Sequence, residues 1–149
     1  MIAVIQRVLR ASVKVDGDIV GTCGHGLAIL LGVANGDTEE DAKKLMTKIS
    51  NLRIFCDEND KMNLSINDIG GSALVISQFT LLANYAKGNR PDYFNAAHPD
   101  EANALYEYFC EGFEKLIPGP VGRGVFGAHM ECEFINNGPV TIVMDSKIL

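Results

Sequence analysis

The stretch AVIQRVLRASVKVDGDIVGT (residues 3–22) has the pattern of two strands joined by a tight turn. Residues 3–15 are rich in Val and Ile, which favour strands. Asp16-Gly17 then separates the two apolar segments, and this dipeptide accepts the positive φ angles that a type I′ turn requires. The stretch therefore predicts a β-hairpin, and the remaining segments are interpreted around it.

Further strands and two helices follow along the chain. Helices are predicted at 36–52, where Thr38 is the candidate N-cap, and from His98-Pro99 to Pro118, where Pro stands at the first helical position. Apolar residues repeat in both segments with a helical period. The further strands are predicted at GLAILLGVA (26–34), LRIFCD (52–57), SALVISQFTLL (72–82), AHMECEFIN (128–136) and VTIVMD (140–145).

The predicted order of elements is β-β-β-α-β-β-α-β-β. Strands and helices do not alternate strictly, which disfavours a doubly wound parallel sheet. We expect an α/β fold with mixed or antiparallel sheets, partly barrel-like, and two main helices. A chain of 149 residues has the length of one domain, so residues 1–149 are predicted to form a single compact domain.

The composition restricts the class of protein. Lys and Arg total 13 against 19 Asp and Glu, a formal charge of −6, which argues against binding nucleic acid through bulk positive charge but leaves room for a local basic patch. The longest apolar run, LAILLGVA (27–34), is too short to cross a bilayer. The N-terminal segment lacks the basic region and cleavage site of a signal peptide. We expect a soluble, cytoplasmic protein.

The cysteines, the histidines and one glycine motif give no sign of a cofactor. The four cysteines form no C-x-x-C pair, and the three histidines lack zinc-ligand spacing, so free thiols and no metal are expected. No G-x-S-x-G motif marks a serine hydrolase. GRGVFG (122–127) matches the dinucleotide pattern, but a helix and two prolines precede it and a strand follows. Its glycines are interpreted as sites of close backbone approach.

Two short motifs stand out. In SQFTL (77–81) a buried strand turns polar at Ser77-Gln78, which indicates either satisfied strand-end residues or a site where N–H groups and hydroxyls converge. In FINNGPVT (134–141) Asn137-Gly138 predicts a hairpin turn, yet Pro139 has no N–H to close it. The alternatives are an irregular turn between edge strands and a cis Gly138-Pro139 bond that turns both carbonyls to one side.

Together these motifs resemble the two signatures of the D-aminoacyl-tRNA deacylase family. The resemblance extends over the whole chain, through AVIQRV (3–8), ASVKVDG (11–17), LLGVANGDTEEDA (30–42), NLRIF (51–55), KMNLS (61–65) and FGAHM (126–130). It implies a cofactor-free homodimer that hydrolyses the ester between a D-amino acid, or mischarged glycine, and tRNA. The alternatives are a relaxed relative that edits a misacylated L-amino acid, and a non-catalytic domain of the same fold.

The resemblance also implies roles for individual residues. Gly138 and Pro139, in cis, would reach into the partner subunit's site and hold the amino group of the D-residue. Backbone N–H groups of Phe79 and Thr80 would stabilise the oxyanion. The nucleophile would be water assisted by the tRNA 2′-OH, since no base for the Thr80 hydroxyl is evident in the motif. The other implied site residues are Ser77 and Gln78, which position the substrate, Phe126 and Met130 in the pocket, and Arg7, which anchors the Gly-Pro segment.

The chain departs from the family pattern at two positions. Asn89 stands where the family often has an arginine, and His129 where it often has an acidic residue. The first change removes a possible phosphate contact, and the second places a titratable group beside the pocket. A local basic patch for tRNA is expected from Lys61, Lys87, Arg90 and Arg123.

Overall fold

The computed structural model describes all 149 residues and contains eight strands, two α-helices and two 3₁₀ turns. Three strands lie between the helices, where the sequence predicted two, because residues 62–64 pair back on 55–56. In chain order the elements are β1 (Ile2–Val15), β2 (Asp18–Cys23), β3 (Gly26–Gly32), α1 (Glu39–Ser50), β4 (Phe55–Cys56), β5 (Met62–Leu64), β6 (Ser72–Ser77), η1 (Phe79–Leu82), α2 (Pro99–Glu114), β7 (Val121–Arg123), β8 (Glu131–Asp145) and η2 (Ser146–Ile148).

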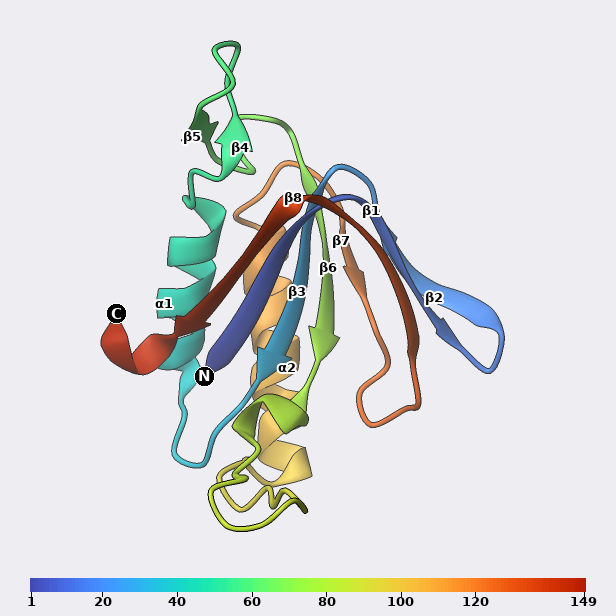
Figure 1. Ribbon diagram of the computed structural model, residues 1–149, viewed down its shortest axis with the longest axis vertical. Helices are drawn as coiled ribbons and strands as arrows, with labels where there is room; N and C mark the ends of the chain where they lie inside the picture. Colours follow the sequence, from blue (N-terminus) through green and yellow to red (C-terminus); the bar gives the residue numbers. More distant parts are fainter.

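The central strand of the main sheet is β1, which pairs with β2, β3 and β8. The sheet runs in the order β2-β1-β3-β6-β7, with parallel pairs β3–β6 and β6–β7 and antiparallel pairs elsewhere. Figure 1 shows α1 and α2 on one side of it, and the separate β4–β5 pair at one end. The predicted α/β class with a mixed, partly barrel-like sheet and two helices is confirmed.

Two glycines let the sheet curl toward a barrel. A Cβ atom on Gly21 of β2 would collide with the main chain of Arg123, and one on Gly122 of β7 would collide with the main chain of Thr22. The two strands therefore approach at backbone distance, which a side chain would prevent. For Gly122, this confirms the interpretation that the glycines of GRGVFG are sites where two backbone segments approach closely.

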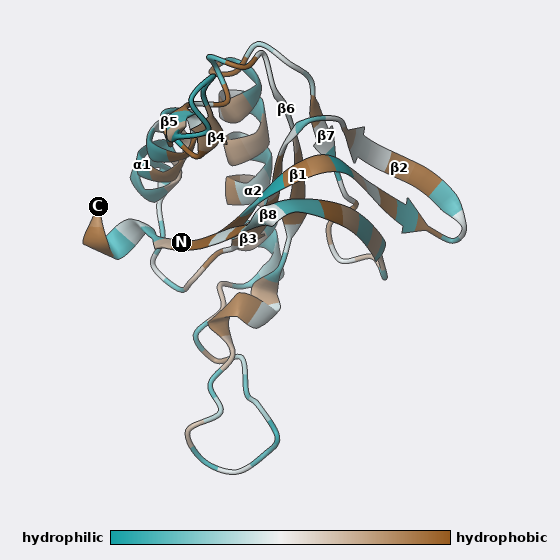
Figure 2. Cartoon of the chain, turned by 45° about the horizontal axis from the view of Figure 1, so that its top comes forward, coloured by the Kyte–Doolittle hydropathy of each residue, from teal (hydrophilic) through white to brown (hydrophobic).

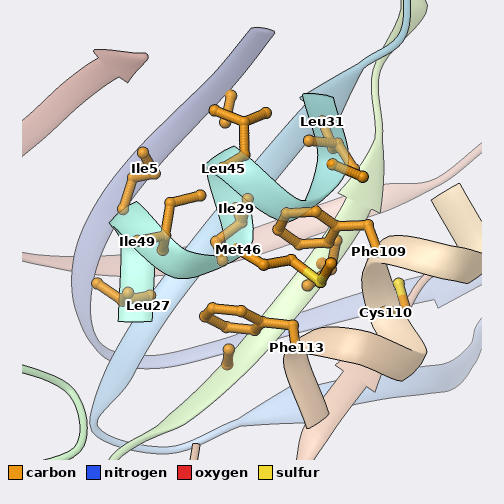
Figure 3. Close-up of a cluster of buried hydrophobic side chains, with 14 of the residues drawn as sticks. Ile5, Leu27, Ile29, Leu31, Leu45, Met46, Ile49, Phe109, Cys110 and Phe113 are labelled. Atoms are coloured by element: carbon orange, nitrogen blue, oxygen red, sulfur yellow. The ribbon is translucent and has the colours of Figure 1, made fainter. Parts of the chain in front are cut away.

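The main core lies between the helices and the sheet. In α1 the buried Leu45 and Ile49 face the strands, and in α2 the rings of Phe109 and Phe113 stack at 5.5 Å (Figure 3). Each such buried side chain contributes about 1.5–3 kcal/mol. No helix is long and apolar enough to span a membrane.

Local signals located several elements correctly. Asp16 and Gly17 have φ angles of 50° and 83°, as a type I′ hairpin requires. Thr38 is the N-cap of α1, and Pro99 opens α2 after His98. In the predicted strand at 52–57, by contrast, only Phe55–Cys56 pairs, against β5.

The predicted strand at 72–82 is wrong in its second half. The last ladder bond runs from the Gln78 N–H to the Leu31 carbonyl at 2.8 Å, just before β3 ends. The chain then turns into η1, which packs over Gly32. A Cβ atom on Gly32 would stand 2.6 Å from Leu82 Cδ2, so the missing side chain makes room for the turn.

The two predicted strands at 128–136 and 140–145 are one strand, β8, so the hairpin turn and the irregular turn are both wrong, whereas the alternative of a cis Gly138-Pro139 bond is confirmed. The Gly138-Pro139 bond is cis and lies within this strand. The Val140 N–H donates to Asn136 Oδ1 at 3.0 Å, and the pairing with β1 is irregular around Val8. The side chain of Asn136 thus satisfies a backbone donor that the regular ladder leaves out.

Asp41, in the first turn of α1, is buried and links that turn to the end of the chain. Its carboxylate accepts hydrogen bonds from the Thr38 N–H at 2.9 Å, the Ser146 hydroxyl at 2.8 Å and Lys147 Nζ at 2.9 Å. Burial alone would raise the pKa of Asp41, but the hydrogen bonds from Lys147, Thr38 and Ser146 lower it by more. The pKa of Asp41 therefore lies well below its ordinary value. The folded state therefore favours the ionised form.

Asp41 is accordingly expected to stabilise the fold in a pH-dependent way. A carboxyl whose pKa is depressed on folding contributes its full stability above its unfolded pKa of about 3.9 and loses it as the pH falls toward the folded value. We expect Asp41→Asn to lower the free energy of unfolding at pH 7, with a difference from wild type that shrinks below about pH 4. Urea unfolding at pH 7, 5 and 3.5 measures this. A difference that stays constant with pH would contradict it.

Candidate functional site

A pocket of about 780 Å³ opens where β6 ends, between η1, the start of α2 and the segment that leads into β8. It contains five of the predicted site residues, which are Ser77, Gln78, Phe79, Phe126 and Met130, and His129, which was expected beside it, also lines it. The remaining lining residues are Asn35, Ile76, Tyr93, Phe94, Ala96, Ala97, His98, Pro99, Ala102, Gly127, Ala128, His129 and Cys132. In Figure 1 the end of β6 and the following turn lie in the lower part of the molecule.

The start of η1 presents free backbone donors beside this pocket. The first N–H groups of a helical turn have no partner within it. In η1 the Leu81 N–H bonds to the Gln78 carbonyl at 3.3 Å, so those of Phe79 and Thr80 precede the first intrahelical bond. The Gln78 amide donates to Thr80 Oγ1. Two adjacent N–H groups at the end of a strand are suited to receive a developing oxyanion.

An aromatic wall on one side was missed by the sequence reasoning. The Phe79 ring meets Tyr93 edge-on, with ring centroids 5.0 Å apart, and Phe94 is 85% exposed. Asn35 holds this segment, donating from Nδ2 to the Phe94 carbonyl at 2.7 Å. The available signal was the pair Tyr93-Phe94 in the loop 83–98, which Figure 2 shows as mostly hydrophilic.

The opposite wall comes from the segment between β7 and β8. Phe126 packs against Tyr106 with ring centroids 6.1 Å apart, and the buried Tyr106 hydroxyl donates to the Val75 carbonyl at 2.8 Å. Met130 packs against a second, smaller hydrophobic cluster, which contains Val8, Leu74 and Ile76. The pocket is therefore apolar on this side and polar at the end of β6.

The titratable groups of the pocket offer no activated protein nucleophile. Cys132 is its only thiol, and burial raises the pKa of that thiol, which disfavours the reactive thiolate at neutral pH. The one hydrogen bond to the Thr80 hydroxyl comes from the Gln78 amide, which cannot remove a proton. The pocket therefore gives no support to a nucleophilic thiol or hydroxyl of the protein.

Arg7 and the dipeptide Gly138-Pro139 lie elsewhere on the sheet. Arg7 is buried, with Nε donating to the Asn137 carbonyl at 2.7 Å and Nη1 to the Ile54 carbonyl at 2.7 Å. The guanidinium thus fixes the carbonyl directly before Gly138. Gly138 and Pro139 themselves are exposed.

The dipeptide lies far from the pocket of its own chain. Gly138 in β8 lies opposite Arg7 in β1, and Arg7 pairs with Leu27 in β3. Ser77 in β6 pairs with Leu31 in β3, four residues further along that strand. Three strand spacings and an offset of four residues give a separation of about 20 Å. In Figure 1 the middle of β8 is at the top and the end of β6 points to the bottom.

The expected basic patch is not a single surface. Arg123 is engaged by Glu107 at 3.0 Å and Glu114 at 3.5 Å, so its assignment to a free patch is wrong. Lys87 and Arg90 are exposed on the loop 83–98, near the pocket, together with Asn89. Lys61 lies in the β4–β5 turn, at the other end of the molecule (Figure 1).

Comparison with known proteins gives matches along the whole chain. The family model described as D-Tyr-tRNA(Tyr) deacylase matches residues 4–145. Proteins named D-aminoacyl-tRNA deacylase from Sulfurihydrogenibium sp. and Persephonella marina are 57% and 58% identical, each over 100% of both chains.

Solved structures give the same coverage. A structure titled c-Myc DNA Unwinding Element Binding Protein is 40% identical, with a TM-score of 0.92 over 97% of this chain and 98% of that one. A probable eukaryotic D-amino acid tRNA deacylase, 18% identical with a TM-score of 0.80 over the same shares, has the same fold.

Proposed function

The chain belongs to the D-Tyr-tRNA(Tyr) deacylase family, whose members hydrolyse D-aminoacyl-tRNA, and from this premise we propose that its active site is shared between two copies. One copy supplies the pocket at the end of β6, and the other supplies Gly138-Pro139, here called the filter dipeptide. The observation that carries the proposal is the strand order and register, which place these two motifs three strands and four residues apart within one chain.

A bare sheet face beside the filter dipeptide favours a homodimer. On the side of β1 and β8 away from the helices, Val143 is 70% exposed and its partner Val4 is half-buried. Apolar strand faces of this kind are commonly covered by a partner. A symmetric dimer built on this face brings each filter dipeptide to the other copy.

The proposed reaction uses main-chain groups. Water attacks the ester carbonyl, and the N–H groups of Phe79 and Thr80 stabilise the oxyanion. The ribose oxygen of the tRNA leaves with a proton, for which the neighbouring 2′-OH serves as relay, and the products are free amino acid and tRNA. Ser77 and Gln78 position the ester, while Phe126 and Met130 bound the side-chain space. No cofactor takes part.

The proposed selection for D-residues uses backbone carbonyls. Those of Gly138 and Pro139 accept hydrogen bonds from the ammonium group of the bound D-aminoacyl end, with Arg7 holding the preceding carbonyl. An L-residue held by the same ammonium group would direct its side chain into the filter dipeptide. Glycine, which has no side chain, is accepted, so mischarged glycyl-tRNA is a second substrate. We place this reaction in the cytoplasm, carried out by residues 1–149 as a single domain.

The chirality claim is tested with D-Tyr-tRNA and L-Tyr-tRNA of the same tRNA. We expect rapid release of D-tyrosine and at least about 100-fold slower release of L-tyrosine, since a clash that excludes the ester from its reactive position costs about 3 kcal/mol or more. Equal rates would contradict the filter. Preference for the L-substrate would favour a relaxed editing relative.

Replacing Thr80 by Ala is expected to leave kcat/KM for D-Tyr-tRNA within about tenfold of wild type, or about 1.4 kcal/mol of barrier. The reason is that the Thr80 hydroxyl only accepts a hydrogen bond from the Gln78 amide. The main-chain N–H of residue 80, which stabilises the oxyanion in the proposed reaction, is kept in the variant. Single-turnover hydrolysis measures this. A loss above about 1,000-fold would instead assign Thr80 as the nucleophile.

A further inference from the structure

The exposed aromatic residues of the chain all lie in one short segment beside the pocket. The chain has 7 Phe and 4 Tyr, and those that are exposed are Phe79, Tyr85, Tyr93 and Phe94. Tyr85 and Phe94 are the most exposed, at 74% and 85%, and are called the stacking platform here. A single exposed apolar side chain is ordinary, but several gathered beside a pocket indicate a binding surface.

The main chain that carries Phe94 is fixed at the rim of the pocket. The Phe94 carbonyl accepts a hydrogen bond from Asn35 Nδ2 at 2.7 Å, and the Asn95 carbonyl accepts one from the Asn35 N–H at 2.9 Å. Shortly after, the Ala97 N–H donates to the Val33 carbonyl at 2.9 Å. Phe94 itself lines the pocket. A ring presented on an ordered main chain loses little conformational freedom when a ligand covers it, which favours binding.

The loop that carries Tyr85 is closed at its base by Asn84 and Asp92. Each of these two residues donates its N–H to the other's carbonyl at 2.9 Å, and Asn84 Nδ2 donates to Asp92 Oδ2 at 3.0 Å. Tyr85 directly follows this bridge, and Phe94 stands two residues after it. Figure 2 shows the loop projecting from the body of the molecule. The bridge therefore links the base of a projecting loop to the rim of the pocket.

This loop carries free positive charge on an acidic protein. Residues 79–98 contain Lys87, Arg90 and the single carboxylate of Asp92, so their formal charge is 2 − 1 = +1, against −6 for the whole chain. Both oxygens of Asp92 accept hydrogen bonds at the base of the loop. No carboxylate lies within 4.0 Å of Lys87 or Arg90. Exposed aromatic rings beside free cations are the combination with which proteins bind unpaired nucleic acid.

We propose that the stacking platform binds the bases of the unpaired tRNA nucleotides that precede the aminoacylated one, while Lys87 and Arg90 contact their phosphates. This inference rests on the proposed function, because it assigns the part of the substrate that lies outside the pocket. Phe94, at the rim, is the first ring that the strand meets on leaving the pocket, and Tyr85 and the two cations belong to the projecting loop. Stacking accepts any base, so the platform adds affinity for every tRNA.

The stacking claim is tested with Phe94→Leu, which keeps an apolar side chain but removes the aromatic face. The ligands are uncharged tRNA and the same tRNA trimmed of its unpaired 3′ nucleotides, and anisotropy titration measures Kd. For Phe94→Leu we expect a Kd about tenfold higher than that of wild type on intact tRNA, as the loss of one stacked base produces, and no change on trimmed tRNA. Phe94→Trp, which keeps a ring, is expected to match wild type. So is the control Ile148→Ala, whose side chain is 83% exposed in η2.

The phosphate contacts are tested with Lys87→Gln/Arg90→Gln against the control Lys14→Gln/Lys115→Gln. Both variants change the charge equally, and all four side chains are exposed. We expect the loop variant to lower the logarithmic salt slope of tRNA binding by about 1.4, because each phosphate contact on a single strand contributes about 0.7. The control is expected to keep the wild-type slope.

Three results would overturn the proposal. They are an unchanged Kd of Phe94→Leu on intact tRNA, an equal loss on intact and trimmed tRNA, and gel filtration in which Phe94→Leu weakens the dimer, because a partner subunit would then cover the ring. Equal salt slopes for the loop variant and wild type would overturn the phosphate contacts. The proposed function fails separately, because a wild-type protein that binds tRNA through Phe94 but leaves D-Tyr-tRNA intact would contradict that function alone.

Discussion

Replacing Gly138 by Ala is expected to lower kcat/KM for D-Tyr-tRNA by at least about 100-fold. A Cβ atom there would collide with the Val140 main chain and stand 2.8 Å from Val140 Cγ2, so the segment must move. Its carbonyls then leave the position that holds the ammonium group of the substrate. A displacement of about 1 Å at such a contact costs on the order of 100-fold in rate.

Gly24→Ala is the matched control for this variant. Gly24 lies in the connection between β2 and β3, and the nearest atom to an added Cβ would be Ser72 Oγ at 3.8 Å, an ordinary contact distance. We expect this variant to retain wild-type activity. Thermal midpoint and gel filtration establish that Gly138→Ala keeps the fold and the dimer. A folded, dimeric Gly138→Ala enzyme within about threefold of wild type would contradict the role of the filter dipeptide.

Asp37→Asn is expected to lower the free energy of unfolding by about 3–5 kcal/mol, because it leaves a buried ammonium group without its counter-charge. Asp37 Oδ2 lies 2.7 Å from the Met1 ammonium group, and both groups are fully buried. The same carboxylate accepts the Ala34 N–H at 2.6 Å and pairs with Lys147 at 3.0 Å. An amide in this place retains the shape but not the charge.

Urea unfolding at pH 7 measures the effect, with Asp100→Asn as control. The Asp100 side chain is 95% exposed, so the control is expected to change stability by less than about 0.5 kcal/mol. Typical domains are stable by about 5–15 kcal/mol, so the Asp37 variant loses a large part of the total. A change below about 1 kcal/mol would show that the buried pair adds little over a neutral hydrogen bond.

The elements that the sequence predicted well are those with local causes. The Asp16-Gly17 turn depends on two residues that accept positive φ, and the start of α1 depends on Thr38 at the N-cap. The two helices have apolar stripes of helical period, which are visible in any single window of sequence.

The features that the sequence missed depend on residues far apart in the chain. Strand β6 stops at Ser77 because its neighbour β3 ends at Gly32, whose missing side chain admits η1. The single strand β8 passes through Pro139 because β1 accompanies it along both halves. No local pattern reports which strand will lie alongside.

Only part of the site was predicted, because its other parts also depend on residues far apart in the chain. SQFTL and FGAHM marked two walls of the pocket, but Tyr93 joins it only through its contact with Phe79 across the loop. That the filter dipeptide lies about 20 Å from the pocket follows from strand order and register, which the motifs do not encode. The assignment of Arg123 to a free basic patch failed because Glu107 and Glu114 on α2 engage it.

The shared active site is tested most directly by mixing two inactive variants. Ser77→Phe fills the pocket but keeps the filter dipeptide, and Gly138→Ala disrupts the filter dipeptide but keeps the pocket. After dissociation and reassociation of an equal mixture, half of the dimers contain one copy of each. In those dimers one site combines an intact pocket with an intact filter dipeptide from the other copy. We predict recovery of about a quarter of the wild-type activity on D-Tyr-tRNA. A mixture that forms mixed dimers but stays as inactive as either variant alone would contradict the shared site.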